Sequence, residues 1–233
     1  MGYRAVFAAV AMLFAAVPVA SAQDIGEQWD THTRAAVKAY GLAQMDIAAA
    51  EANAALAIAE KNFKPGDDRL QTSVLNSFSI ERGMGHYDAA LAFGMRLEAM
   101  QRRADPKDPN LAITVNLIAG VYRDMKSADP MVATYKRAID LAKANIGEFD
   151  PYTVAVREDY AAALGEAGRG EEGAKLWPQI AKDWAVALGP DHLRISISYA
   201  GYAQLLRSLG RTAEADAAAA ESARIADVYA RQR

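Results

Sequence analysis

Small and large apolar residues recur along the chain in paired segments, and turn residues separate these segments at a fixed interval. Acidic turn residues are spaced by 41, 42 and 41 positions, at Asp67, Asp108, Asp150 and Asp191. A second marker, 18 or 19 positions further on each time, is spaced by 41, 42 and 42, at Gly85, Lys126, Gly168 and Gly210. Such a period indicates stacked supersecondary units, because one helix pair cannot bury its apolar face alone.

Each unit is predicted to hold two helices around the second marker. Aspartate followed by proline starts a helix, and glycine at the marker ends one in a left-handed cap. Lys126 departs from glycine, so we expect a looser second turn with the helix restarting at Asp129-Pro130. Asp191 is expected to start the last unit. The predicted helices span residues 68–82, 87–103, 109–125, 130–146, 151–167, 171–188, 191–209 and 213–229.

Counting from the second marker shows where neighbouring helices would cross closely. Small residues dominate seven positions before it and five positions after it, as close helix crossings require. The residues seven before are Phe78, Ala119, Ala161 and Ala203, and those five after are Ala90, Met131, Gly173 and Ala215. Alanine dominates the 52% hydrophobic fraction and aromatics reach only 8%, a balance that favours packed helices over sheets.

This small-glycine-small arrangement resembles the tetratricopeptide repeat. The period of about 42, with phrases such as Leu209-Gly210-Arg211 and Leu188-Gly189-Pro190-Asp191-His192, resembles its longer kinesin-light-chain-type variant. The resemblance implies an all-α fold, a right-handed α-solenoid of stacked antiparallel helix pairs. HEAT-like units of 40 to 47 residues are the nearest structural alternative, although the glycine turns favour the shorter helix pairs.

The predicted organisation has three parts. Residues 67–233 would form four tetratricopeptide-like repeats with a C-terminal capping helix. Residues 27–40 and 44–63 read as one more helix pair, in which Ala43 takes the place of the marker but the motif is lost. Residues 23–66 are therefore expected to form a degenerate N-terminal cap.

The first 22 residues read as a secretory signal peptide. Arg4 precedes an apolar run from Ala5 to Val17, and Ala20-Ser21-Ala22 supplies the small residues of a cleavage site. The run is shorter than the roughly 20 residues of a spanning helix, although an uncleaved anchor is the alternative. Without cysteine or a glycosylation sequon, the protein is expected to be bacterial, and periplasmic or secreted after cleavage following Ala22. No stable membrane insertion is expected after cleavage.

The resemblance also implies a concave groove lined by the first helix of each pair, at positions 3, 6 and 10 before the marker. Three arginines there could bind an acidic segment or the C-terminus of a polypeptide, and Asn116 could hold a peptide backbone. The same arginines could equally be solvated or paired between helices. The groove residues we nominate are Arg82, Asn116, Arg123, Glu158, Gln204 and Arg207.

Catalytic chemistry is not predicted. The three histidines, at 32, 86 and 192, lack a metal-ligand spacing, and a turn or cap role is expected for His86 and His192. No nucleophile elbow or phosphate loop occurs, so we expect no catalytic residue, metal or cofactor. The adjacent acids Glu158 and Asp159 are expected to be solvated on different helix faces.

These observations predict an exported scaffold that binds a protein or peptide in its groove. A net charge of -3 and a pI near 5.7 give no basic face for nucleic acid. The alternative function is a structural part of a cell-envelope assembly, acting through the solenoid ends or an uncleaved anchor. An enzyme whose site the sequence does not reveal is a third reading.

Overall fold

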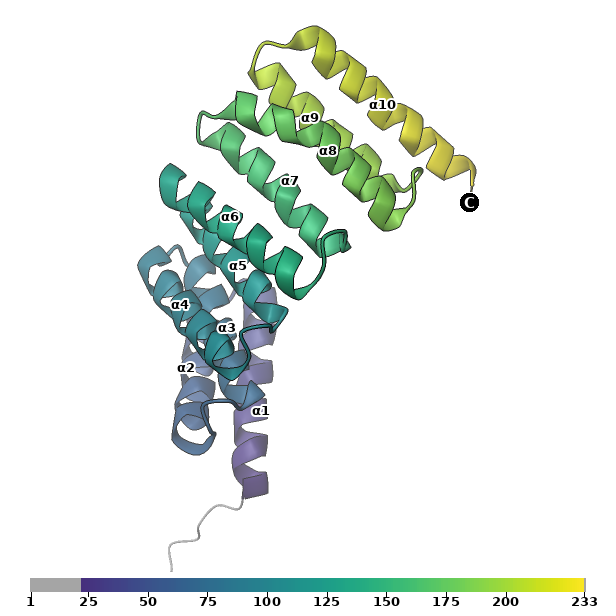
Figure 1. Ribbon diagram of the computed structural model, residues 1–233. Coiled ribbons are helices and arrows are strands. Elements are labelled where there is room, and N and C mark those ends of the chain that lie inside the picture. The colour runs from purple at the N-terminus through teal and green to yellow at the C-terminus, as the bar shows by residue number, and fades with distance from the viewer. Residues whose placement is uncertain (1–21, 233) are drawn as a thin grey trace, which may run out of the picture.

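The computed structural model describes residues 22–232, and all regular structure within that range is helical. Consecutive helices form five hairpins that stack along one axis, with the N-terminal and C-terminal pairs at opposite ends (Figure 1). The helices are α1 (Ala22–Gly41), α2 (Met45–Asn62), α3 (Asp68–Gly83), α4 (Tyr87–Ala104), α5 (Asn110–Asp124), α6 (Ala128–Asn145), α7 (Pro151–Glu166), α8 (Gly170–Leu188), α9 (Leu193–Ser208) and α10 (Thr212–Arg231). The expected all-α solenoid is therefore confirmed. The predicted signal peptide, apart from Ala22, lies outside the described residues.

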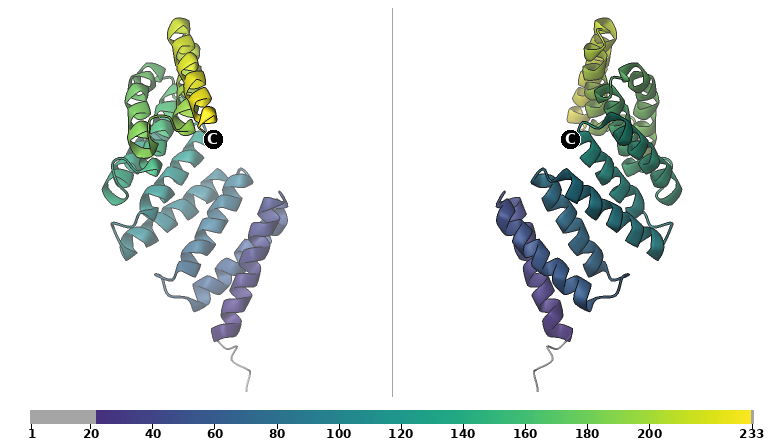
Figure 2. Two further views of the ribbon diagram at one scale, coloured as in Figure 1. Left: turned by 90° about the vertical axis from the view of Figure 1, so that its right-hand side faces the viewer. Right: turned by 90° about the vertical axis from the view of Figure 1, so that its left-hand side faces the viewer.

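The helices form two layers, odd-numbered and even-numbered. Each helix packs mainly on its neighbours in sequence, but α1 also contacts α3 and α7 contacts α9, whereas no pair of even-numbered helices has comparable contacts. The odd-numbered layer is therefore the inner, concave one. Successive pairs are rotated relative to one another, which gives the stack a superhelical twist (Figure 2). Within the described range no helix has the length and apolar character needed to cross a membrane.

The turn inside every hairpin has one geometry. The marker residues have φ between 55° and 78°, and the amide after each donates to the carbonyl five positions earlier at 2.7–3.0 Å. They are Ala43, Gly85, Lys126, Gly168 and Gly210. The expected looser turn at Lys126 is therefore wrong. Lysine adopts the same left-handed conformation because the closing bond, from Ser127 N to the Tyr122 carbonyl, forms at 2.9 Å.

The first helix of most units starts at or just after its acidic marker, and two helix starts differ from the prediction. Asp67, Asp108 and Asp150 accept a hydrogen bond from the amide two residues later; Asp67 and Asp150 are the N-caps of α3 and α7, whereas Asp108 lies one residue before Pro109, the N-cap of α5. In the last unit His192 Nδ1 instead accepts a hydrogen bond from the Arg194 amide at 3.1 Å. His192 therefore has the cap role expected for it, and the expectation that Asp191 starts this helix is wrong. The second exception is α6, which begins at Ala128, so Pro130 lies in its first turn, where no amide hydrogen is needed.

Small residues hold the helices of each pair close together. The alanines seven positions before the marker, at 119, 161 and 203, are at most 1% exposed. A side chain at Gly173 would overlap the carbonyl oxygen of Ala161 on the facing helix. The one large residue of this set, Phe78, is accommodated by Gly94, where an added Cβ would lie 3.1 Å from the Phe78 ring. The close crossings predicted for the helix pairs are therefore present. In the α3–α4 pair the large residue, Phe78, is on the first helix and the small one, Gly94, is on the second.

Candidate functional site

One stripe of residues runs along the inner face of the odd-numbered helices. Positions 13, 10, 6 and 3 before each marker are separated by three or four residues, so they share one helix face. We call these positions the concave stripe. Several of its members line hollows between neighbouring odd-numbered helices, as the inside of a curved stack requires. From α1 to α9 the stripe consists of Asp30, Thr33, Val37, Tyr40, Thr72, Leu75, Ser79, Arg82, Ile113, Asn116, Gly120, Arg123, Ala155, Glu158, Ala162, Gly165, Ile197, Ala200, Gln204 and Arg207.

Two of the three nominated arginines join neighbouring repeats. Arg82 on α3 donates through Nε to Asp124 on α5 at 2.6 Å, and its guanidinium lies against the backbone of Gly120. Arg123 on α5 makes the equivalent pair with Glu166 on α7, with Nε donating at 2.8 Å. The hydrogen bonds that Arg123 donates to the Glu166 carboxylate raise the pKa of Arg123. An acidic ligand at either arginine would have to displace a carboxylate of the protein itself.

Arg207 differs from these two arginines. Its only ion pair within the described residues is with Asp216 on α10 at 3.5 Å, and its side chain is 55% exposed. Nearby, Gln204 is also exposed and faces Arg123 across a hollow of about 380 Å³ between α5, α7 and α9. Gly165 replaces the arginine of the stripe in α7, which leaves this hollow open. The structure thus brings Arg123 and Gln204 together at the C-terminal half of the stripe.

The remaining nominated residues, Asn116 and Glu158, are tied into the interfaces between repeats. Glu158 is 12% exposed, accepts from Trp184 Nε1 at 2.8 Å and pairs with Arg194 at 3.0 Å. Burial raises the pKa of Glu158 despite these two contacts. Asn116 Oδ1 is buried with no hydrogen bond of standard geometry, and Asn116 lies near Tyr152 and Asp159, whose pKa values are both raised by burial. Glu158 is therefore not free to hold a ligand backbone as placed.

The expectation that Glu158 and Asp159 are solvated is wrong. They point to different sides of α7, about 100° apart around the helix axis, but both sides face a neighbouring repeat. Glu158 faces α8 and α9, whereas Asp159 is partly buried near Asn116 and Arg123 of α5. Burial raises the pKa of Asp159, outweighing the opposite effects of Arg123 and Asn116.

Replacing Asp159 with asparagine should therefore raise the thermal midpoint at pH 7, on the order of 2 °C. The folded-state pKa lies above the unfolded one, so the folded protein is penalised while the carboxyl is ionised. That penalty disappears as the pH falls through both pKa values, and no gain is expected near about pH 3. Thermal melts of Asp159→Asn and of exposed Asp140→Asn at both pH values test this. An equal gain in both variants would contradict it.

The exposed apolar members of the concave stripe are not among the groove residues predicted from the sequence. Five of the twelve large apolar side chains that are exposed among the described residues lie in this stripe. They are Val37 (57%), Tyr40 (39%), Leu75 (36%), Ile113 (38%) and Ile197 (53%). Tyr40, Val37 and Leu75 lie at positions 3, 6 and 10 that were already counted, and Ile113 and Ile197 could have been found by extending the count to 13 before the marker. The inner face is thus more apolar than its arginines suggested.

Within residues 22–232, no three histidine or acidic side chains come together as a metal site would require. His86 and His32 each contact a glutamate, Glu81 at 2.8 Å and Glu51 at 2.6 Å. The concave stripe therefore offers apolar contact area, one loosely paired arginine and several amide or hydroxyl groups.

Comparison with solved structures shows the same fold. Nearly identical TPR-like (tetratricopeptide-like) repeats of a kinesin-light-chain sequence from Podosopora anserina align with a TM-score of 0.75, at 16% identity over 88% of this chain and 97% of that one. BtubC from P. vanneervenii aligns at 0.66, with 13% identity over 88% of this chain and 92% of that one. YrrB, a TPR protein with an unusual peptide-binding site, aligns at 0.53, with 12% identity over 92% of this chain and all of that one.

Sequence comparison adds no relative to these structural ones. No protein-family model matches the chain, and a search of curated proteins also finds no match. At identities of 12–16%, the structural neighbours show a shared solenoid fold and nothing finer.

Proposed function

We propose that this chain is a non-enzymatic scaffold that binds a protein or peptide segment along its concave stripe. The observation that carries the proposal is the row of exposed apolar side chains on the inner face, at α1, α3, α5 and α9. Exposed apolar area on a concave surface is typical of interaction sites. A structural neighbour, YrrB, has a peptide-binding site on a fold of the same kind, which supports this reading.

The stripe suggests two zones for such a partner. Toward the N-terminus, Val37 and Tyr40 on α1 are exposed and line a hollow together with Ser79 of α3, and Leu75 is exposed one turn before Ser79 on the same face of α3. Toward the C-terminus, the loosely paired Arg207 and exposed Gln204 could meet a carboxylate or the end of a polypeptide. The proposed partner segment is therefore mainly apolar, with an acidic group or its C-terminus at the α9 end.

A pair of charge insertions tests the groove. Leu75→Glu/Ile113→Glu places two carboxylates in the concave stripe, whereas Met95→Glu/Val186→Glu places them at exposed apolar positions of even-numbered helices. Captured partners from a cell-envelope extract should be lost with the first variant, by at least about tenfold in affinity once the partner is purified. The second variant should retain them. Retention by the stripe variant together with loss by the control would reject the concave site.

We also propose that the protein is exported and cleaved after Ala22. The sequence of residues 1–22 supports this, because Arg4, the apolar run and Ala20-Ser21-Ala22 have the features of a cleaved signal peptide. Mass spectrometry of the protein recovered from the periplasm and the medium should find Gln23 as the N-terminal residue. Recovery of the uncleaved protein with membranes would instead favour the structural role through an N-terminal anchor.

A further inference from the structure

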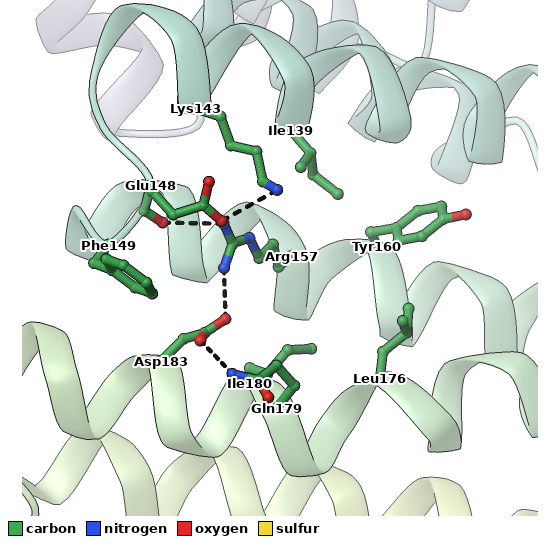
Figure 3. A pocket seen from close by; sticks show the side chains of 10 residues that line it. All are labelled: Ile139, Lys143, Glu148, Phe149, Arg157, Tyr160, Leu176, Gln179, Ile180 and Asp183. Carbon is green, nitrogen blue, oxygen red and sulfur yellow. Dashed lines mark hydrogen bonds and ion pairs between the residues drawn. The ribbon is translucent and has the colours of Figure 1, made fainter.

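A second hollow lies on the opposite side of the solenoid, between two even-numbered helices. Its walls are α6 and α8, its floor is α7, and the loop before α7 closes one end (Figure 3). We call it the outer slot. Its volume is about 390 Å³, and its apolar lining consists of Ile139, Phe149, Tyr160, Leu176 and Ile180. The slot exists because α6 and α8 each pack on α7 but make no comparable contact with each other.

The charged groups inside the outer slot neutralise one another. Arg157 on α7 pairs with Asp183 on α8 and with Glu148 in the loop, and Lys143 on α6 pairs with Glu148 at 3.1 Å (Figure 3). The side chains of Arg157 and Asp183 are 13% and 3% exposed. This network is internal to the fold, so it leaves no net charge to attract a ligand into the slot.

The apolar walls, in contrast, reach the surface. Phe149 is 48% exposed and Leu176 is 38% exposed, on opposite sides of the slot mouth. Ile139 on α6 and Tyr160 on the floor are only partly buried. Large apolar side chains around a concave opening are more costly to leave in water than scattered surface ones, and they commonly mark a docking site.

The rim of the outer slot is basic. Lys136 shares a face of α6 with Ile139 and Lys143, and Lys175 and Lys182 share a face of α8 with Gln179, which lines the slot. Lys136, Lys175 and Lys182 are exposed, and none forms an ion pair within the described residues.

Most acids of the two walls already have partners. Asp183, Glu171 and Glu172 pair with arginines, which leaves Asp129 and Asp140. Asp129 lies at the start of α6, beyond the slot-lining residues, so Asp140 is the one unpaired acid of the walls beside the three lysines. The rim is therefore positive although the protein as a whole has a net charge of -3.

We propose that the outer slot binds an acidic amphipathic helix of a partner protein. Two large apolar side chains of that helix, one turn apart, would enter between Phe149 and Leu176. Glutamates on both flanks would meet the lysines of α6 and α8. This site is distinct from the concave stripe, since it is built from the even-numbered helices and the loop at 146–150.

The spacing of the lysines supports a helical partner. Lys136 and Lys143 are seven residues apart on α6, and so are Lys175 and Lys182 on α8. Seven residues are two turns, about 10.5 Å, along a helix. A partner helix lying along the slot would repeat its glutamates at the same interval, so Lys175 and Lys182 on α8 could match it over two turns, whereas on α6 Lys136 is free of ion pairs within the described residues and Lys143 already pairs with Glu148.

A designed peptide tests the slot before the natural partner has been identified. The probe is an alanine- and glutamate-based helix of roughly 18 residues, long enough to be helical alone, with leucines at i and i+4 and glutamates seven apart on both flanks. Binding is followed by methyl NMR and fluorescence anisotropy. We expect saturable binding with shifts of the Ile139, Leu176 and Ile180 methyls.

Charge reversal provides the matched comparison. Lys175→Glu/Lys182→Glu should weaken binding at least about tenfold, and a peptide with lysines in place of its glutamates should bind this variant more tightly than the unmodified protein. Lys38→Glu/Lys61→Glu, the same charge change at exposed positions of α1 and α2, should bind the original peptide with little change. A variant with Leu176→Ser should lose affinity while keeping its helical circular dichroism.

Three results would overturn the proposal. They are no saturable binding at about 1 mM peptide, equal affinity of the two double-charge variants, and methyl shifts confined to the concave stripe. Sedimentation of the protein without peptide measures whether it self-associates through the outer slot. Self-association that Leu176→Ser abolishes would assign the slot to a second copy of the protein instead.

Discussion

Replacing Gly173 with alanine should destabilise the protein by about 3 kcal/mol, against the trend for helices. Gly173 lies within α8, where alanine normally stabilises a helix by about 1 kcal/mol relative to glycine. Here an added Cβ would come closer than 3.0 Å to the carbonyl oxygen of Ala161 on α7. A backbone atom cannot move aside as a flexible side chain does, so α7 and α8 must separate and lose packing.

Thermal and urea denaturation measure this effect, with an expected fall in melting temperature of about 6–12 °C. Gly41→Ala is the control, because Gly41 ends α1 and an added Cβ would contact nothing within 4 Å. That control should change stability by less than about 1 kcal/mol. If Gly173→Ala proved as stable as the unmodified protein, the close crossing of α7 and α8 would be wrong.

The second large effect is expected at Asp183, where replacement by alanine should cost about 3 kcal/mol. The Asp183 carboxylate, 3% exposed, accepts hydrogen bonds from Arg157 and from Gln179. Without it, the guanidinium of Arg157 would remain largely buried with only exposed Glu148 as its partner. A buried charge that loses its partner costs more than the pair itself contributed.

The double replacement Arg157→Met/Asp183→Leu separates the cost of an unpaired buried charge from the contribution of the ion pair itself. Because it removes both charges, it should recover most of the stability that Asp183→Ala loses. An exposed pair gives the comparison. Arg169 and Glu172 are 42% and 54% exposed, so Arg169→Ala should leave the free energy of unfolding almost unchanged. Similar losses for Asp183→Ala and Arg169→Ala would contradict the burial of the first pair.

The repeat period predicted the fold because the backbone conformation of the turns fixes where the period markers occur. A left-handed residue must end the first helix of each pair, and glycine is the residue that does so at least cost, so the turns are visible in sequence. Lys126 shows the limit of that signal. With the flanking helices formed and the Ser127 amide bonded to the Tyr122 carbonyl, Lys126 adopts the same left-handed conformation as the glycines. The preference of glycine for that conformation therefore gave the wrong expectation for this turn.

The site was harder to predict because its chemistry depends on contacts between repeats. The partner of Arg82 is 42 residues away and that of Arg123 is 43 away, so only the stacking of the repeats shows that both arginines are paired. Burial of Glu158 and Asp159 likewise depends on which repeat each side of α7 faces. The outer slot combines side chains of three helices and a loop, and no local pattern marks it.

The shared geometry of the five turns also bears on how such a protein changes length over evolution. A segment running from one left-handed residue to the next, such as Gly168 to Gly210, begins and ends in the same backbone conformation. Duplication or loss of that segment would leave two ends that rejoin without a new turn. Only the side chains at one junction would need to adapt, so repeat number can vary in whole units while the remaining interfaces keep their packing.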